Sequence, residues 1–514
     1  MDAAAGAAID PPRESQLNRL VGHLPLSVIL LMALVTRSYR LGRLGFWYDE
    51  GASAYMAEAI RAHGWTFDLH PPLYVALLAV WSTVADSDLW LRSLSVVFGV
   101  ATVAVIYALG RTLFTRASGL WAAALLSVTY FHVKYSQEAR MYALMGLLFA
   151  TAFWGLVIAV RDQRRAGWIM YGVAASLLMY SHGIGVVYVT ALALLFPLLA
   201  PQLDGWRPWR PWVIANAAIG VLFLPWIAVV AQRVPDVRSR LWIPPGDAEP
   251  PFFSTLQLLT VSTIPPLSSM LRSRLGPMAP VSLGRWVWFV PILAVTLWLV
   301  TRMARRDARA TQILLLAYAV PIALLSAASA VVAPVLIPRV LLPAVVPVVV
   351  LLGSGVEYLS SRRVWNHVIM AGLAGLLLVA TLCFHKWGAK EEWREASQYL
   401  GQHVGQEDLL LFDVDGRWVP PYLLARYDTE QRLVGNPMLM IGPLLAECPG
   451  DVGVCLDRAA EAYRSVKVVW IVHSHTESMA RRGEVERWLH WRFEPVATRV
   501  FEGIQVEQAW IKRE

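Results

Sequence analysis

The chain has 514 residues, of which 57% are hydrophobic and only 16% are charged. Soluble proteins average roughly a quarter charged residues, so this composition excludes an ordinary soluble globular protein. The formal net charge of +8 does not indicate a nucleic-acid partner. Much of the basic excess lies in short loops between apolar blocks, where it reports membrane topology.

Apolar blocks of about 15–22 residues, near the length that crosses a bilayer, recur between residues 20 and 384. They predict an all-α polytopic membrane domain, residues 1–384, with about eleven transmembrane helices. Arg13 and Arg19 precede the first block, which favours a cytoplasmic N-terminus, and the basic short loops then fall on the cytoplasmic side. The predicted spans are residues 20–38, 92–110, 118–132, 141–160, 167–181, 184–200, 211–230, 286–301, 311–332, 340–357 and 364–384.

The apolar piece Leu73–Val84 is not counted as a span. It is too short to cross a bilayer comfortably, and counting it would put every later basic loop outside. We therefore predict an interfacial or re-entrant helix that begins at Pro71-Pro72. The first outer loop then covers residues 39–91, and a second, long outer loop covers residues 231–284.

Residues 385–514 are polar and charged, and they predict a small α/β domain on the extracytoplasmic face. Residues 408–412 and 466–472 have the pattern of short buried strands. Cys448 and Cys455 allow two interpretations. They form a disulfide if the domain lies outside the cell, or they are two free thiols.

Two adjacent carboxylates, Asp49 and Glu50, lie just beyond the first predicted span. A carboxylate at a membrane border costs free energy, so a working role is the first hypothesis. The alternative is that they serve only as the N-cap of a helix over residues 51–60.

Basic residues also collect on the predicted outer face, against the usual topological bias. Arginine binds phosphate oxygens through its planar fork, so an anionic ligand such as a lipid-linked phosphate would explain them. The alternatives are a local Glu138–Arg140 ion pair and a snorkelling Arg339. The outer polar set comprises Asp49, Glu50, His70, Arg92, Lys134, Gln137, Glu138, Arg140, His182 and Arg339, with the arginines of the long loop.

The two outer histidines also have plainer interpretations, His70 as part of a turn and His182 as a helix end with glycine at the exit. No metal cluster, nucleophile elbow, phosphate-cradling glycine loop or dinucleotide fingerprint is present. A nucleotide-using cytoplasmic site is therefore unsupported. Asp49 and Glu138 are the carboxylates at which a divalent metal would bind, although the spacing does not indicate one.

Four motifs follow one another along the chain. They are Phe46-Trp47-Tyr48-Asp49-Glu50, His70-Pro71-Pro72-Leu73-Tyr74, Tyr135-Ser136-Gln137-Glu138-Ala139-Arg140-Met141-Tyr142 and Pro338-Arg339-Val340-Leu341-Leu342-Pro343. In this order they resemble the GT-C superfamily of glycosyltransferases. Within it, the chain is most similar to the bacterial protein O-mannosyltransferase and lipid A aminoarabinose transferase group. The resemblance covers about residues 20–385.

The resemblance implies an enzyme that takes a sugar from a polyprenyl-phosphate donor on the outer side, with inversion at the anomeric carbon. It implies Asp49 as the catalytic base or as a carboxylate that orients the acceptor, supported by Glu50. Residues expected at the donor phosphate are Arg92, Lys134, Arg140 and Arg339. Residues expected at the acceptor side are Tyr48, His70, Glu138 and His182.

We therefore predict an integral enzyme of the bacterial inner membrane, whose active site and C-terminal domain are extracytoplasmic. Its acceptor would be a glycan, a glycolipid or a protein. The loop at residues 231–284 is too short for the β-trefoil insertion of eukaryotic protein mannosyltransferases, which weakens the case for a protein acceptor. The alternative class is a lipid or sugar transporter or flippase, although no internal repeat is visible. A non-catalytic scaffold is a third alternative.

Overall fold

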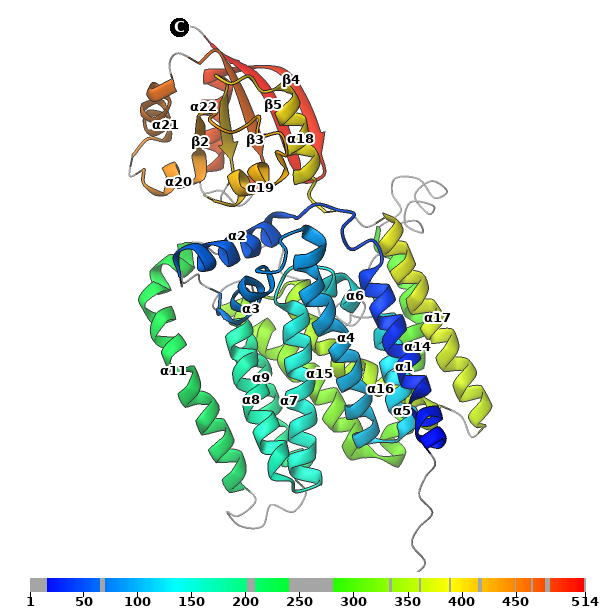
Figure 1. Ribbon diagram of the computed structural model, residues 1–514. Helices are drawn as coiled ribbons and strands as arrows, with labels where there is room; N and C mark the ends of the chain where they lie inside the picture. The colour runs from blue at the N-terminus through cyan, green and yellow to red at the C-terminus, as the bar shows by residue number, and fades with distance from the viewer. Residues whose placement is uncertain are drawn as a thin grey trace, which may run out of the picture.

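The computed structural model describes residues 16–64, 70–200, 209–239, 281–331, 335–359, 362–387, 390–414, 418–448, 450–463, 466–476 and 481–512. A large bundle of helices carries a small sheet domain at one end (Figure 1). Most of the predicted long outer loop, residues 231–284, lies outside the described residues, as do its Arg240, Arg272 and Arg274.

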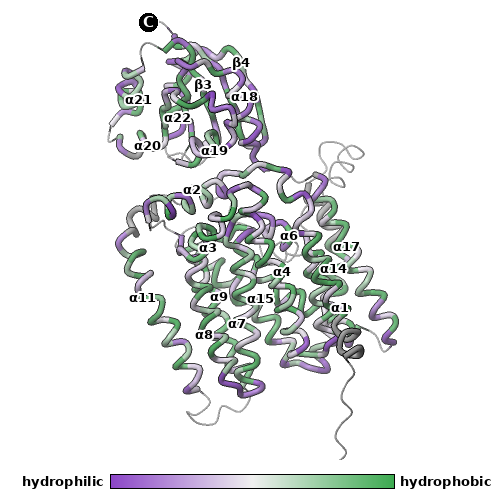
Figure 2. The backbone as a smooth tube through the Cα atoms, in the orientation of Figure 1, coloured by the Kyte–Doolittle hydropathy of each residue, from purple (hydrophilic) through white to green (hydrophobic). Residues whose placement is uncertain are grey.

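Six helices of the described part are long and apolar enough to cross a membrane. The chain is therefore a multi-pass membrane protein, and hydrophobic residues dominate most of the bundle in Figure 2. The six spans are α4 (Asp88–Leu113), α7 (Tyr142–Arg161), the segment Trp209–Gln232 of α11 (Trp209–Ser239), α15 (Ala308–Val331), η2 (Pro338–Ala344) with α16 (Val345–Tyr358), and the segment Arg363–Lys386 of α17 (Arg363–Trp387).

The remaining helices of the bundle overlap the other five predicted spans or lie at its ends, so the count of eleven spans stays a prediction. Several are shorter than a full crossing, because the chain turns within or beside them. They are α1 (Gln16–Ser38), α2 (Tyr48–His63), α3 (Leu73–Trp81), α5 (Arg116–Ser127), α6 (Tyr130–Ser136), α8 (Arg165–Ser181), α9 (Gly185–Leu194), α10 (Phe196–Leu199) and α14 (Val281–Arg306).

Two of these short helices bear on the predicted topology. Helix α3 has only nine residues, so the prediction of a short, non-spanning helix after Pro71-Pro72 is confirmed. The predicted span 118–132 is broken at Val128-Thr129, between α5 and α6. The break lets α6 end in a buried turn that carries Glu138 and Arg140. Helices α2, α3 and α6 lie at the end of the bundle nearest the sheet domain (Figure 1).

The sheet domain contains five strands in the order β2-β1-β3-β5-β4. Strand β1 runs parallel to β2 and β3, whereas β5 runs antiparallel to β3 and β4. Both predicted strands are confirmed, since β1 and β3 begin or end within two residues of the expected bounds. The strands are β1 (Leu409–Asp413), β2 (Met438–Met440), β3 (Val468–His473), β4 (Phe493–Phe501) and β5 (Ile504–Ile511).

Helices pack around this sheet, and α19 faces α2 of the bundle (Figure 1). The approach is close, because a Cβ atom on Gly51 of α2 would lie 2.7 Å from the Leu423 side chain of α19. The helices are α18 (Trp393–His403), α19 (Val419–Tyr427), α20 (Ile441–Ala446), α21 (Val452–Ala460), η3 (Glu461–Tyr463) and α22 (Arg482–Arg492).

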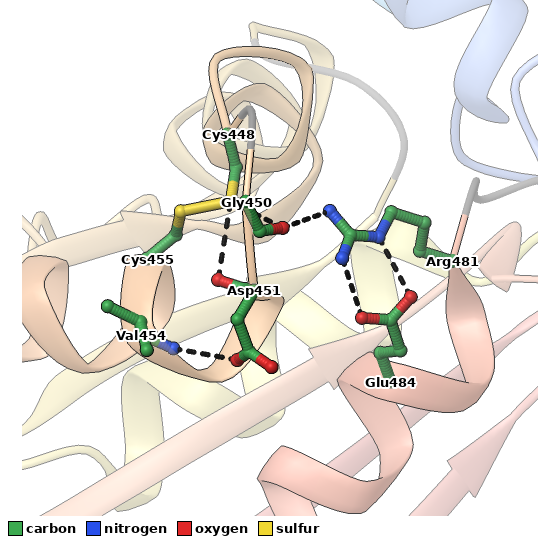
Figure 3. Close-up of a disulfide and its surroundings, with 7 residues drawn as sticks. All are labelled: Cys448, Gly450, Asp451, Val454, Cys455, Arg481 and Glu484. Carbon is green, nitrogen blue, oxygen red and sulfur yellow. Dashed lines mark hydrogen bonds and ion pairs between the residues drawn. A yellow bond between two sulfur atoms is a disulfide. The ribbon is translucent and has the colours of Figure 1, made fainter.

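Cys448 and Cys455 are joined by a disulfide, which decides between the two interpretations of this pair (Figure 3). The linked loop is held further by Asp451, whose side chain accepts the Val454 N–H at the start of α21. Arg481 donates to the Gly450 carbonyl at 2.7 Å, so the disulfide, α21 and the start of α22 form one local unit.

An ionic cluster fastens the sheet domain to the bundle. Asp88, at the first turn of α4, lies 2.8 Å from Arg394 and 2.9 Å from Arg426, and it accepts the Tyr427 hydroxyl at 2.6 Å. The Tyr427 hydroxyl in turn accepts the Phe46 N–H at 2.6 Å. Asp88 is buried, so these partners compensate the cost of removing its charge from water.

Candidate active site

Asp49 and Glu50 lie in the first turn of α2, where the partial positive charge of a helix N-terminus favours carboxylates. The N-cap residue is Trp47, and its side chain makes no capping hydrogen bond. The alternative interpretation of the carboxylates as a helix cap is therefore wrong. Adjacent helical residues point about 100° apart, so the two carboxylates face different surroundings.

Glu50 is fully buried and bound on all sides. Its two oxygens accept from Arg92 at 2.7 and 2.6 Å, and Lys390 and the Ala139 N–H donate at 2.9 Å each. Burial alone would raise the pKa of Glu50, but the charges of Arg92 and Lys390 outweigh it and lower that pKa to about 2. Glu50 is thus permanently ionised and joins the first loop to the α6–α7 turn and to the sheet domain.

Arg92 is engaged by the protein itself. Its five N–H groups are directed to the two oxygens of Glu50 and to the carbonyls of Leu41, Leu44 and Gly45. A guanidinium has five N–H donors, so none is left for a donor phosphate. This geometry therefore does not support the predicted contact of Arg92 with phosphate, because a closer carboxylate and the loop carbonyls use its whole donor set.

Asp49 is the more accessible carboxylate, with 19% of its side chain exposed. One of its oxygens lies 3.4 Å from Arg339 and 3.7 Å from Arg140. Burial would raise its pKa, but Arg140, Arg339 and the nearby His70 and His475 lower it below the usual range. Asp49 is consequently ionised and is held by long, loose ion pairs.

The two arginines at Asp49 come from different parts of the chain. Arg140, in the α6–α7 turn, donates to the Asp49 carbonyl and the Ser53 hydroxyl at 3.1 and 3.0 Å. Arg339 is the second residue of η2, and its guanidinium stacks over the Trp47 ring at 5.5 Å. Arg339 is thus held beside Asp49, so the interpretation as a merely snorkelling side chain does not fit.

Three buried polar atoms near these residues have no hydrogen-bond partner among the described residues. They are the Trp47 Nε1, the Arg140 Nε and the Glu138 Oε2. Buried polar groups are nearly always satisfied, so unpaired ones at a single place indicate a site for water or a ligand.

Glu138 and Lys134 complete the charged group. Glu138 is buried, and its pKa is raised because burial outweighs the charges of Lys390 and Lys134. The Nζ of Lys390, from the C-terminal part of the chain, lies 3.8 Å from the Oε1 of Glu138, so the two side chains form a long ion pair. Lys134 is half-buried at the end of α6 and interacts electrostatically with Glu138 and Arg339. The local Glu138–Arg140 ion pair that the sequence allowed is not formed, since Arg140 turns to Asp49.

A divalent metal does not fit these carboxylates. Asp49 faces two guanidinium groups, and Glu138 faces an ammonium group, so each lies among cations. In the described residues, no three His, Cys, Asp or Glu side chains are grouped as metal ligands.

His70 and His182 form a separate aromatic group beside the charges. Their rings lie 5.8 Å apart, and the His182 ring lies 6.1 Å from that of Tyr142. Burial lowers the pKa of His182 well below its ordinary value, so the ring is neutral. Its Nδ1 accepts the Ile184 N–H, so it also shapes the α8–α9 turn. Tyr48 is half-buried, and its ring contacts His475 at 5.1 Å.

Three residues of this site were not anticipated from the sequence. Lys390, Glu391 and His475 all belong to the C-terminal part, and each contacts the first turn of α2 or its side chains. The only sequence signal was the charged stretch that follows the last apolar block. It does not show which charges turn back to the membrane domain.

Comparisons with known proteins show which family model and which solved structures the chain resembles. The family model of dolichyl-phosphate-mannose-protein mannosyltransferase matches residues 69–229. No curated protein matches the chain in sequence. The structure of ArnT from Cupriavidus metallidurans in the apo state is similar over 96% of this chain and 98% of that one, with 12% identity and a TM-score of 0.59. The same protein bound to undecaprenyl phosphate gives 12% identity over the same shares and a TM-score of 0.58.

A third similar structure is the Archaeoglobus fulgidus oligosaccharyltransferase in complex with Zn and sulfate. It shares 14% identity and a TM-score of 0.54, over 86% of this chain and 67% of that one. The family model covers less than half of the chain. The structural likeness, nearly end to end for ArnT, shows that the chain shares the fold of these proteins.

Proposed function

We propose that this protein is an inverting glycosyltransferase that moves a sugar from a polyprenyl-phosphate donor to an extracytoplasmic acceptor. The observation that carries the proposal is the loose Asp49 ion pair with Arg140 and Arg339, at the end of a multi-pass bundle. A base and two anion-binding groups in one place suit an acceptor hydroxyl and a phosphate leaving group.

In this proposal, Arg339 and Arg140 bind the donor phosphate, and Lys134 adds a third positive charge nearby. Arginine binds phosphate well through paired N–H donors. The unpaired Nε of Arg140 supplies one such donor. Arg92 does not bind the donor phosphate in this proposal. It positions Glu50 and the first loop instead.

Asp49 acts as the general base. The acceptor oxygen attacks the anomeric carbon while the bond to the phosphate oxygen breaks, and Asp49 takes the hydroxyl proton. The departing phosphate gains negative charge, which the arginines stabilise. Phosphate leaves without protonation, so a second, acidic carboxylate is not required, and direct displacement inverts the anomeric carbon.

Donor binding would also make Asp49 a better base. The arginines hold its pKa low in the free protein, whereas a base works best when its pKa lies nearer the working pH. A phosphate that shares Arg140 and Arg339 would weaken their hold on Asp49 and raise that pKa. Proton removal would then follow donor binding.

We infer that the site and the sheet domain are extracytoplasmic in a bacterial inner membrane, with about eleven spans. The Cys448–Cys455 disulfide supports this side, because disulfides persist in oxidising compartments. His70, His182, Tyr48 and Glu138 remain candidates for the acceptor side. The transporter alternative is not favoured, since the polar residues collect at one end of the bundle instead of at its middle.

The decisive experiment replaces Asp49 with asparagine. D49N should abolish sugar transfer, a loss of at least about 10³-fold, while the protein still folds and binds undecaprenyl phosphate. Transfer is measured by mass spectrometry of cell-envelope glycans and by release of undecaprenyl phosphate from membranes of a deletion strain. If D49N transferred sugar at the same rate as the wild-type protein, Asp49 would not be the base.

A further inference from the structure

The turn that follows β3 connects the sheet domain to the proposed catalytic helix. Strand β3 ends at His473, and His475 lies two residues later with a left-handed backbone (φ 52°). Its ring lies 5.1 Å from that of Tyr48, the residue before Asp49. A non-glycine residue in this backbone region carries strain, and strain of this kind often accompanies a functional constraint.

Glu391 joins this turn to the backbone of α2. One carboxylate oxygen accepts the Tyr48 N–H at 2.9 Å and the Trp393 indole N–H at 2.8 Å. The other oxygen lies 3.1 Å from the Nε2 of His475, and the Nδ1 of His475 lies 3.0 Å from the Ser474 hydroxyl. Both oxygens of Glu391 and both ring nitrogens of His475 therefore take part in one chain of contacts.

These contacts of Glu391 and His475 replace the side-chain cap that α2 lacks. The first N–H groups of a helix have no partner within the helix, and Trp47 supplies no side-chain cap. Glu391 accepts one of these N–H groups from another part of the protein, and its charge suits the helix N-terminus. The next residue back, Lys390, binds Glu50 at 2.9 Å. The consecutive residues Lys390 and Glu391 thus bind the first turn of α2 on either side of Asp49, at Glu50 and at Tyr48.

We propose that Glu391 and His475 are a positioning pair, which holds the first turn of α2 so that the Asp49 carboxylate points to the acceptor hydroxyl. The inference rests on the proposed function of Asp49 as the base. It assigns the sheet domain a part in catalysis, since two of its residues set the direction of a base on the membrane domain. His475 is also among the groups that lower the pKa of Asp49, which is consistent with this proximity.

The test compares His475→Gln, Glu391→Gln and the double variant with wild type, in the full-length protein in nanodiscs. His490→Ala is the matched control, because His490 is an exposed histidine of the same domain. Initial rates are taken with increasing amounts of deletion-strain membranes, which supply the native donor and acceptor. Binding of undecaprenyl phosphate and the melting temperature are measured on each variant.

Each single variant should lower the limiting rate about 10–100-fold, because a small misplacement of a catalytic group costs this much. Undecaprenyl phosphate affinity should stay within about twofold, and the double variant should be no slower than the slower single variant, since the pair acts as a unit. His490→Ala should behave as wild type. Limiting rates equal to wild type, additive losses, or losses that merely follow a fall in melting temperature would each overturn the inference.

The same measurements separate this inference from the proposed function. An active wild type and an inactive D49N, together with fully active His475→Gln and Glu391→Gln, would overturn the positioning pair alone. No transfer by wild type, or full transfer by D49N, would overturn the proposed function and the pair with it.

Discussion

The two neighbouring carboxylates of α2, Asp49 and Glu50, have different roles. Glu50 has no exposed surface and four charged or N–H donors around it, whereas Asp49 is partly exposed and has only long ion pairs. The difference follows from the helix, which turns one side chain into the interior and the next to the rim. A buried charge with complete partners is structural, and a looser one is available for chemistry.

Arg92→Ala should leave Glu50 buried without its main partner. Breaking a buried ion pair costs about 3–5 kcal/mol, so we expect a strong fall in melting temperature or loss of folded protein. Thermal unfolding in detergent measures the melting temperature, and size-exclusion chromatography measures the amount of folded protein. Arg339→Ala is the control, because its side chain is 17% exposed. It should keep the melting temperature and instead weaken undecaprenyl phosphate binding. An Arg92→Ala protein as stable as wild type would contradict the structural role.

Among the secondary-structure elements, three strands of the sheet domain share a partly buried ionic contact. His473 at the end of β3 lies 2.7 Å from Asp413 of β1 and 3.5 Å from Glu507 of β5. Burial alone would lower the pKa of His473, but the hydrogen bonds and charges of the two carboxylates raise it to about 9. His473 is therefore charged at neutral pH, and its ion pairs link β3 to β1 and β5.

This contact makes the stability of the sheet domain pH-dependent. The folded pKa of His473 exceeds the ordinary value of about 6.5, so its stabilisation is complete below about pH 6.5 and is lost as pH rises through about 9. Melting temperatures of wild type should fall by several degrees between these limits. His473→Gln should start lower and change less over the same range. If the melting temperatures of both proteins fell equally over this pH range, titratable groups other than His473 would cause the effect.

At the scale of the whole molecule, the sheet domain and the bundle are joined by charged contacts at separate places. Asp88 holds Arg394 and Arg426, and the first turn of α2 holds Lys390 and Glu391. The proposed active site therefore lies at a junction of two parts of the chain, and its side of the membrane is that of the sheet domain.

The membrane side can be tested with the native cysteines. If the sheet domain is extracytoplasmic, an impermeant reductant followed by an impermeant maleimide should label Cys448 and Cys455 in spheroplasts. Cys383 lies within a spanning helix and should stay unlabelled until the membrane is dissolved. The variant lacking Cys448 and Cys455 serves as the control. Labelling that requires permeabilised cells would put the sheet domain in the cytosol.

The membrane class, the short helix α3, the strands β1 and β3, and the motifs with Asp49, Arg140 and Arg339 could all be predicted before folding was considered. Each of these follows from local composition, from segment length, or from a motif read along the chain. Which cation pairs with which carboxylate depends instead on the folded arrangement. Arg92 is 42 residues from Glu50 and Lys390 is 340 residues from it, and no local pattern predicts such pairs. Folding brings these groups out of water together, so each buried charge takes the partner that the packing supplies.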